Sequence, residues 1–113
     1  MAAPAQRRAE APSVTREGGR VAVGGRLDFA SAREVLDRVS SEIESASEPV
    51  TVDLGGVTSS NSAGLALLVE WLAVGRRAGR AVRLANVPDG LVQLARVCQV
   101  DALIGAATVP AAG

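Results

Sequence analysis

The sequence contains no histidine and no lysine, and its only aromatic residues are Phe29 and Trp71. Without histidine it lacks the side chain most often used as a general base or a metal ligand. Without lysine it has no P-loop, so its glycine pairs are predicted to be turns rather than nucleotide-binding loops. Two aromatic rings cannot form a surface on which bases stack. These absences argue against an enzyme, a metal or cofactor site and a nucleic-acid partner.

The charged residues are balanced, with twelve arginines against twelve acidic side chains. No lysine-rich patch for nucleic acid or a membrane surface is therefore predicted. The single cysteine, Cys98, cannot form an internal disulfide, and it lies in an apolar-periodic stretch. We expect it to be a buried thiol that packs as a small hydrophobic side chain in a reducing compartment.

The chain is predicted to be one domain without a targeting or membrane-spanning segment. Residues 1–12 contain no apolar run long enough for a signal-peptide core and are expected to be a disordered tail. The longest apolar stretch, Ala63 to Gly75, is interrupted by Glu70 and is shorter than the ~20 residues of a membrane-spanning helix. We place a single domain at residues 13–104 and a flexible tail at 105–113. A cytoplasmic location follows from this interpretation, with no direct insertion into a membrane.

Alternating strand and helix patterns predict an α/β fold. Short β-prone segments at 14–16 and 20–23 flank Glu17-Gly18-Gly19, which predicts an opening antiparallel hairpin. A capping box at Ser31–Glu34 predicts the start of a helix that ends before Pro49. The remaining elements are expected to be a strand at 50–54, a loop at 55–60, a helix at 62–78, a strand at 81–85 and a helix opened by Asn86-Val87-Pro88. Gly79 is the expected stop of the 62–78 helix, and Leu91, Leu94, Ala95 and Cys98 mark the buried face of the last helix. Helices that alternate with strands imply parallel pairing, so we predict a mixed sheet with helices packed on it.

The predicted helix at 62–78 has two apolar faces. One face consists of Leu65, Leu68, Val69 and Leu72 and is the stripe that packs on the sheet. The other, on the far side of the helix, consists of Ala63, Leu67, Trp71 and Val74. Other parts of the domain could cover this second stripe. We favour a partner-binding surface, because so short a chain offers little cover and Trp is frequent in binding hot spots.

The segment Val52-Asp53-Leu54, then Val57, and then Asn61-Ser62-Ala63-Gly64-Leu65 resembles the strand, loop and helix start of STAS domains. The resemblance covers residues 14–104, and Gly25-Arg26-Leu27-Asp28 also resembles the family. Within the family, the sequence is most similar to the MlaB branch at Gly64-Leu65-Ala66-Leu67-Leu68, Gly79, Val87-Pro88 and Leu94-Ala95. The fold implied by the resemblance is the α/β fold predicted above.

The resemblance implies a non-catalytic domain that docks on another protein. In the MlaB branch it implies binding to the ATPase subunit (MlaF-like) of a phospholipid-transport ABC transporter, alongside permease and substrate-binding subunits. Such a complex maintains outer-membrane lipid asymmetry, and the subunit lies at the cytoplasmic side of the inner membrane. The helix start that carries the resemblance, taken together with the second apolar stripe, gives the predicted partner-binding residues, which are Asn61, Ser62, Ala63, Gly64, Leu67, Trp71 and Val74.

Other roles for the helix start stay open. In the anti-sigma-factor antagonist branch, a serine that maps onto Ser62 is phosphorylated to break a complex. The sequence departs from that branch, with Asn61 where aspartate is common and Ala63 where many antagonists have a second serine. Asn61 or Ser62 could instead be only the N-cap of the helix. A third hypothesis, a lipid-binding or small-molecule-binding domain, requires an apolar cavity under the helices.

Overall fold

A computed structural model describes residues 11–109 of the chain. The elements, in chain order, are β1 (Ser13–Glu17), β2 (Arg20–Leu27), α2 (Ala32–Ser45), β3 (Val50–Ser60), α3 (Ser62–Ala78), β4 (Val82–Ala85), α4 (Asp89–Val97) and α5 (Asp101–Ala107). Residues 1–10 and 110–113, which include most of the predicted N-terminal tail and the last four residues of the predicted C-terminal tail, lie outside the described part.

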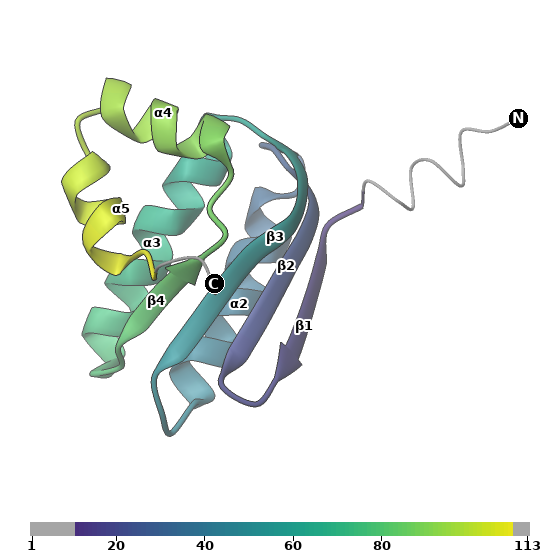
Figure 1. Cartoon of the computed structure of the whole chain (residues 1–113). Coiled ribbons are helices and arrows are strands. Elements are labelled where there is room, and N and C mark those ends of the chain that lie inside the picture. Colours follow the sequence, from purple (N-terminus) through teal and green to yellow (C-terminus); the bar gives the residue numbers. More distant parts are fainter. Residues whose placement is uncertain (1–10, 110–113) are drawn as a thin grey trace, which may run out of the picture.

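The strands form one mixed sheet in the order β1-β2-β3-β4 (Figure 1). β1 and β2 form the predicted antiparallel hairpin around Gly18-Gly19, and β2, β3 and β4 run parallel. Val21 pairs with Val52, and Val52 pairs with Leu84, so the inner strands present one continuous apolar row. The predicted combination of a hairpin with parallel strands is confirmed.

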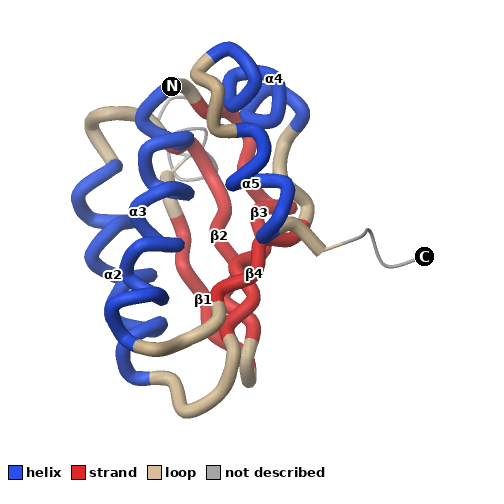
Figure 2. The backbone as a smooth tube through the Cα atoms, turned by 90° about the vertical axis from the view of Figure 1, so that its left-hand side faces the viewer, coloured by secondary structure: helices blue, strands red, loops and turns tan. Residues whose placement is uncertain are grey.

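The helices α2 and α3 lie side by side on one face of the sheet (Figure 2). The buried residues of β3 alternate up to Leu54 because successive side chains point to opposite faces, and in β2 the same alternation is interrupted at Gly24 and Gly25. Those on the helical face, such as Val21, Val52 and Leu54, form the core together with the inner sides of α2 and α3. α4 closes the end of this core, and α5 lies beside β4.

β3 is longer than predicted, because the expected loop at 55–60 continues the strand to Ser60. Gly56 pairs with Gly24 of β2 near register shifts typical of β-bulges. A Cβ on Gly56 would lie 3.3 Å from the Gly24 Cα, so side chains there would force the two strands apart. The prediction that Gly24-Gly25 and Gly55-Gly56 are turns is wrong, since these glycines permit close approach of paired strands.

The start of α2 lacks the predicted capping box, whereas the end of α3 lies at the predicted glycine. α2 begins after Ser31 as predicted, but the capping box is not formed. Instead, the Ser31 hydroxyl donates to the Arg26 carbonyl at 3.0 Å, and Asp28 accepts the Ser31 N–H at 3.1 Å. α3 ends at Gly79, whose φ of 67° is left-handed, and this predicted stop is confirmed.

The C-terminal region is more ordered than predicted. α5 includes Gly105 within the expected flexible tail, and Thr108 forms a parallel bridge with Leu84 of β4. The expectation of a flexible tail is therefore wrong for residues 105–109. Cys98 is exposed at the end of α4, so the prediction of a buried thiol is also wrong, whereas Leu91 and Ala95 of the same helix are buried. No helix within residues 11–109 is long and apolar enough to cross a membrane.

Candidate functional site

The second apolar stripe of α3 is part of the core. Trp71 is completely buried, and Ala63, Leu67 and Val74 are each at most 5% exposed. α3 contacts α2, α4 and β4, so neighbouring elements cover two of its sides. The prediction that this stripe is an exposed partner surface is therefore wrong, and the alternative that the domain itself covers it is correct. Of the predicted docking residues, the structure exposes Asn61 and Ser62 and buries Ala63, Gly64, Leu67, Trp71 and Val74.

Asn61 is the N-cap of α3. Its backbone is extended, and its Oδ1 accepts the N–H of Ala63 at 2.9 Å. Its backbone carbonyl accepts the N–H of Gly64 at 2.9 Å. These bonds satisfy N–H groups that would otherwise have no partner in the first turn of a helix. The cap role, which the sequence left open between two residues, belongs to Asn61.

Ser62 follows the cap as the first residue of α3. It is exposed, and its hydroxyl forms no hydrogen bond with any residue in the range 11–109. A serine hydroxyl is both a donor and an acceptor, and here it lies at the positive end of the helix dipole. Ser62 is thus available to an incoming group.

The loop after β2 brings an aromatic side chain to the same end of the sheet. Leu27 of β2 pairs with Ser60 of β3, so the chain leaves both parallel strands at one edge. Phe29, two residues after Leu27, is 74% exposed. A Cβ on Gly64 would lie 3.6 Å from the Leu27 Cβ, which shows how tightly α3 packs against this end of β2. We define the helix-start surface as Phe29, Asn61 and Ser62.

Phe29 was missed in the sequence analysis. The available signal was its residue type, since it is one of only two aromatic residues and follows Gly25-Arg26-Leu27-Asp28, the segment that resembles the family. Aromatic residues are enriched in protein interfaces, so an exposed phenylalanine is a candidate interface anchor. The helix-start surface therefore combines an aromatic side chain with a free hydroxyl.

Asp53 holds the loop between β4 and α4 in place. Its carboxylate accepts from Arg20 at 2.7 Å and from the Asn86 amide and the Gly55 N–H, both at 2.9 Å. Partial burial alone raises the pKa of Asp53, but these three donors outweigh that effect and hold its pKa below the ordinary value. Asn86 has a left-handed backbone, with φ of 55°, so the bond to Asp53 fixes an uncommon conformation at the end of β4. The cluster is structural, as all of its partners are within the domain.

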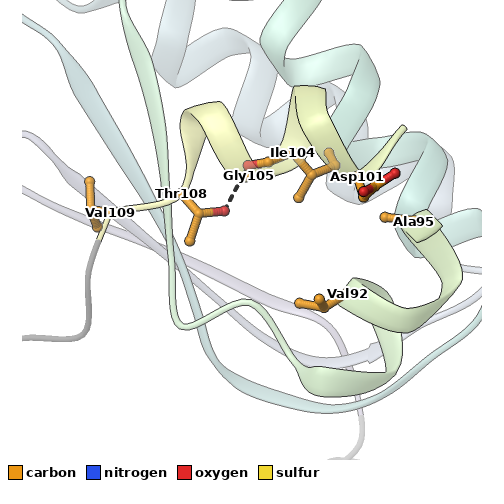
Figure 3. A pocket seen from close by; sticks show the side chains of 7 residues that line it. All are labelled: Val92, Ala95, Asp101, Ile104, Gly105, Thr108 and Val109. Carbon is orange, nitrogen blue, oxygen red and sulfur yellow. Dashed lines mark hydrogen bonds between the residues drawn. The ribbon is translucent and has the colours of Figure 1, made fainter. Parts of the chain in front are cut away.

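An apolar hollow of about 360 Å³ lies between α4, α5 and the segment that follows α5 (Figure 3). Its lining is aliphatic except for Asp101 and Thr108, and the Thr108 hydroxyl donates to the Ile104 carbonyl at 2.7 Å. Across the part of the chain that the structure describes, no group of acidic or cysteine side chains is arranged to hold a metal ion.

A family model described as "Mlab, STAS domain" matches residues 11–105. A chain of the Acinetobacter MlaFEDB complex in an ATP-bound conformation is similar, with 26% identity and a TM-score of 0.65 over 74% of this chain and 87% of that one. The unphosphorylated anti-sigma factor antagonist SpoIIAA shares the fold at 13% identity, with a TM-score of 0.67 over 90% of this chain and 89% of that one. An anti-sigma-factor antagonist STAS domain from Rhodobacter sphaeroides has 22% identity and a TM-score of 0.57 over 65% and 84% of the two chains. The search of curated proteins found no match.

The chain belongs to the STAS domain family, because the family model covers nearly all of the described fold. Among STAS domains it is most like MlaB. Both statements agree with the mixed sheet and the antiparallel hairpin.

Proposed function

We propose that this chain is a non-catalytic subunit that binds and supports the ATPase subunit of an Mla-type phospholipid-transport ABC transporter. The contact is made through the helix-start surface, and no part of the chain handles ATP. In this role the chain works on the cytoplasmic side of the inner membrane, held there by a complex that also contains permease and substrate-binding subunits.

The observation that carries this proposal is that Phe29 and Ser62 are both exposed and follow the paired strand ends at Leu27 and Ser60. Phe29 is 74% exposed, and the Ser62 hydroxyl has no partner among the described residues. Aromatic residues are enriched in the cores of protein interfaces, and polar groups form their rims. The buried stripe of α3 fixes the helix rigidly, so a partner would meet a preformed surface and lose little entropy on binding.

The comparisons support the choice of partner. The match to the family model and the 26% identity to a chain of the MlaFEDB complex both favour a transporter subunit. The departures at Asn61 and Ala63 from the antagonist pattern favour constitutive binding over binding switched by phosphorylation. Asn61 supports this further, because it caps the helix without adding charge.

A pull-down of the tagged full chain from its native cells tests the proposal. We expect wild type to retain an ABC ATPase and its permease, and Phe29→Ala and Ser62→Glu to lose both. Val97→Ala and Ser41→Glu are the matched controls, because they change an exposed apolar residue of α4 and an exposed serine of α2. If the controls lose the ATPase as fully as the two site variants, the helix-start surface is not the contact.

The alternative function is an anti-sigma-factor antagonist regulated by phosphorylation of Ser62. The exposure of the Ser62 hydroxyl favours it, since a kinase needs an accessible acceptor. A phosphate there would add about −1.5 to −2 charges to the docking surface and release a partner. An intact-mass measurement on protein purified from cells distinguishes the two functions. A stoichiometric phosphate, together with capture of a kinase-like protein, would replace the transporter proposal with the antagonist.

A further inference from the structure

A second groove lies at the opposite end of α3 from the helix-start surface. It runs between the last turns of α3, the start of β4 and the outer side of α5, with a volume of about 310 Å³. The residues that line it are Leu72, Arg76, Arg80, Val82, Leu103, Ala106 and Ala107. Apart from the two arginines, all of these side chains are aliphatic.

Both arginines of the groove lack an acidic partner. Arg77 pairs with Glu70 at 3.2 Å, but Arg76 and Arg80 form no ion pair with any residue between 11 and 109. The Arg80 side chain lines the groove, and its Nε, which is buried, has no hydrogen-bond partner among residues 11–109. A guanidinium group without an acidic partner matches the geometry of carboxylate or phosphate oxygens. The groove therefore places two cationic side chains where an anion can bind.

The aliphatic residues of the groove determine which kind of anionic molecule fits it. A peptide brings amide groups that need hydrogen-bond partners when they leave water, and the aliphatic side chains of the groove supply none. An alkyl chain has no such groups and gains free energy by covering apolar surface. Leu103, which is 37% exposed in the groove, is a surface that an alkyl chain would cover.

The hollow between α4 and α5 has an aliphatic wall but no cationic side chain. Its only charged side chain is Asp101, which repels an anionic head group. Of the two apolar depressions that border α5, only the one with Arg76 and Arg80 has both a cationic end and an aliphatic wall.

We propose that the groove formed by α3, β4 and α5 binds a single-chain anionic amphiphile. Its carboxylate or phosphate head group pairs with Arg76 and Arg80, and its alkyl chain lies along Leu72, Leu103 and Ala107. The site is separate from the helix-start surface and does not rest on the function proposed for that surface.

Titration of the ¹⁵N-labelled full chain with sodium dodecanoate, below its micelle-forming concentration, tests the site. The Nε–H resonance of Arg80 should shift and saturate, because a carboxylate bound to this guanidinium changes the environment of its N–H groups. Dodecanoate should bind at least about tenfold more tightly than acetate, which lacks the chain, or dodecyltrimethylammonium, which carries the opposite charge. Dodecyl phosphate distinguishes the head groups and should bind in the same place.

Two double variants test whether dodecanoate binds specifically in the groove or is attracted to any pair of arginines on the surface. Arg76→Gln combined with Arg80→Gln should weaken dodecanoate binding at least about tenfold, whereas Arg83→Gln combined with Arg96→Gln removes the same charge outside the groove and should leave it unchanged. Leu103→Ser should weaken binding of dodecanoate and leave that of acetate unchanged. Equal affinities for the two double variants would overturn the proposal. So would binding only to anionic vesicles, or a stronger shift of the Arg80 resonance by an acidic peptide than by dodecanoate.

Discussion

The Oδ1 atom of Asn61 lies 2.9 Å from the backbone nitrogen of Ala63, and this hydrogen bond assigns the cap of α3 to Asn61. Because Asn61 provides the cap, the hydroxyl of the next residue is not needed to hold the helix. Stability and partner contact therefore depend on adjacent side chains that can be changed independently.

Asn61→Ala should lower the free energy of unfolding by about 1 kcal/mol, since it removes the acceptor for a first-turn N–H. Asn61→Asp should preserve the cap, and its negative charge suits the positive end of the helix dipole. Ser62→Ala should change stability by less than about 0.5 kcal/mol, as the hydroxyl has no partner among the described residues. Urea unfolding of the three variants measures these differences. A loss for Ser62→Ala as large as that for Asn61→Ala would mean that Ser62 also caps the helix.

Trp71→Ala should be strongly destabilising, by about 3–5 kcal/mol, because it empties a fully buried site in the core. Trp71→Phe should lower the stability by at most about a third of that amount, since the indole Nε1 is buried without a hydrogen-bond partner among residues 11–109 and its removal relieves that penalty. Thermal and chemical unfolding of both variants tests the burial directly. If Trp71→Ala kept wild-type stability, the second stripe of α3 would be a surface after all.

Trp71 was predicted to be exposed but is buried, and this difference shows what the periodicity of a sequence can predict. The spacing of Leu67, Trp71 and Val74 showed that this side of α3 is apolar, but it carried no information on what covers it. The helix α3 is covered by its neighbours α2, α4 and β4, whose positions depend on contacts distant in sequence. By comparison, the hairpin at Gly18 and the helix end at Gly79 were predicted correctly, because each depends on the backbone preference of one or two residues.

Errors at the strand and helix boundaries have a similar origin. The stretch from Gly55 to Ser60 has the composition of a loop, yet it pairs with β2, since Gly24 and Gly56 allow the two backbones to approach. Ser31 fits a capping box in sequence, but Asp28 and the Arg26 carbonyl offer its hydroxyl nearer partners. At the candidate site, the position of Ser62 was predicted from resemblance. Phe29 became evident only when the parallel pairing of β2 and β3 placed the segment after β2 and the start of α3 at the same edge of the sheet.

Asp53 makes the stability of the domain depend on pH in the acidic range. Its pKa is lower in the folded state than its ordinary value of 3.8, so it contributes stability above pH 3.8 and loses that contribution as the pH falls through its folded pKa. Asp53→Asn should therefore be less stable than wild type at pH 7, and the difference should shrink below pH 3.8. Urea unfolding over a pH series measures it. Asp37→Asn, which removes an exposed carboxylate without a hydrogen-bond partner in the described structure, controls for loss of charge alone. A constant difference between wild type and Asp53→Asn at all pH values would contradict the lowered pKa.

Gly75→Ala should destabilise the domain by about 1–3 kcal/mol, even though alanine favours helices. A Cβ at this position of α3 would lie 2.5 Å from Val82 Cγ2 and 2.7 Å from the Arg80 carbonyl oxygen, so α3 and β4 would have to separate. Gly105→Ala in α5 is the matched control, because a Cβ there has no atom within 4 Å and should add up to about 1 kcal/mol of stability. Differential scanning calorimetry of the two variants should give shifts in the melting temperature of opposite sign. Since Val82 and Arg80 also line the groove proposed to bind an amphiphile, a stable Gly75→Ala protein would show that α3 and β4 are more loosely packed there, and the shape of that groove would need revision.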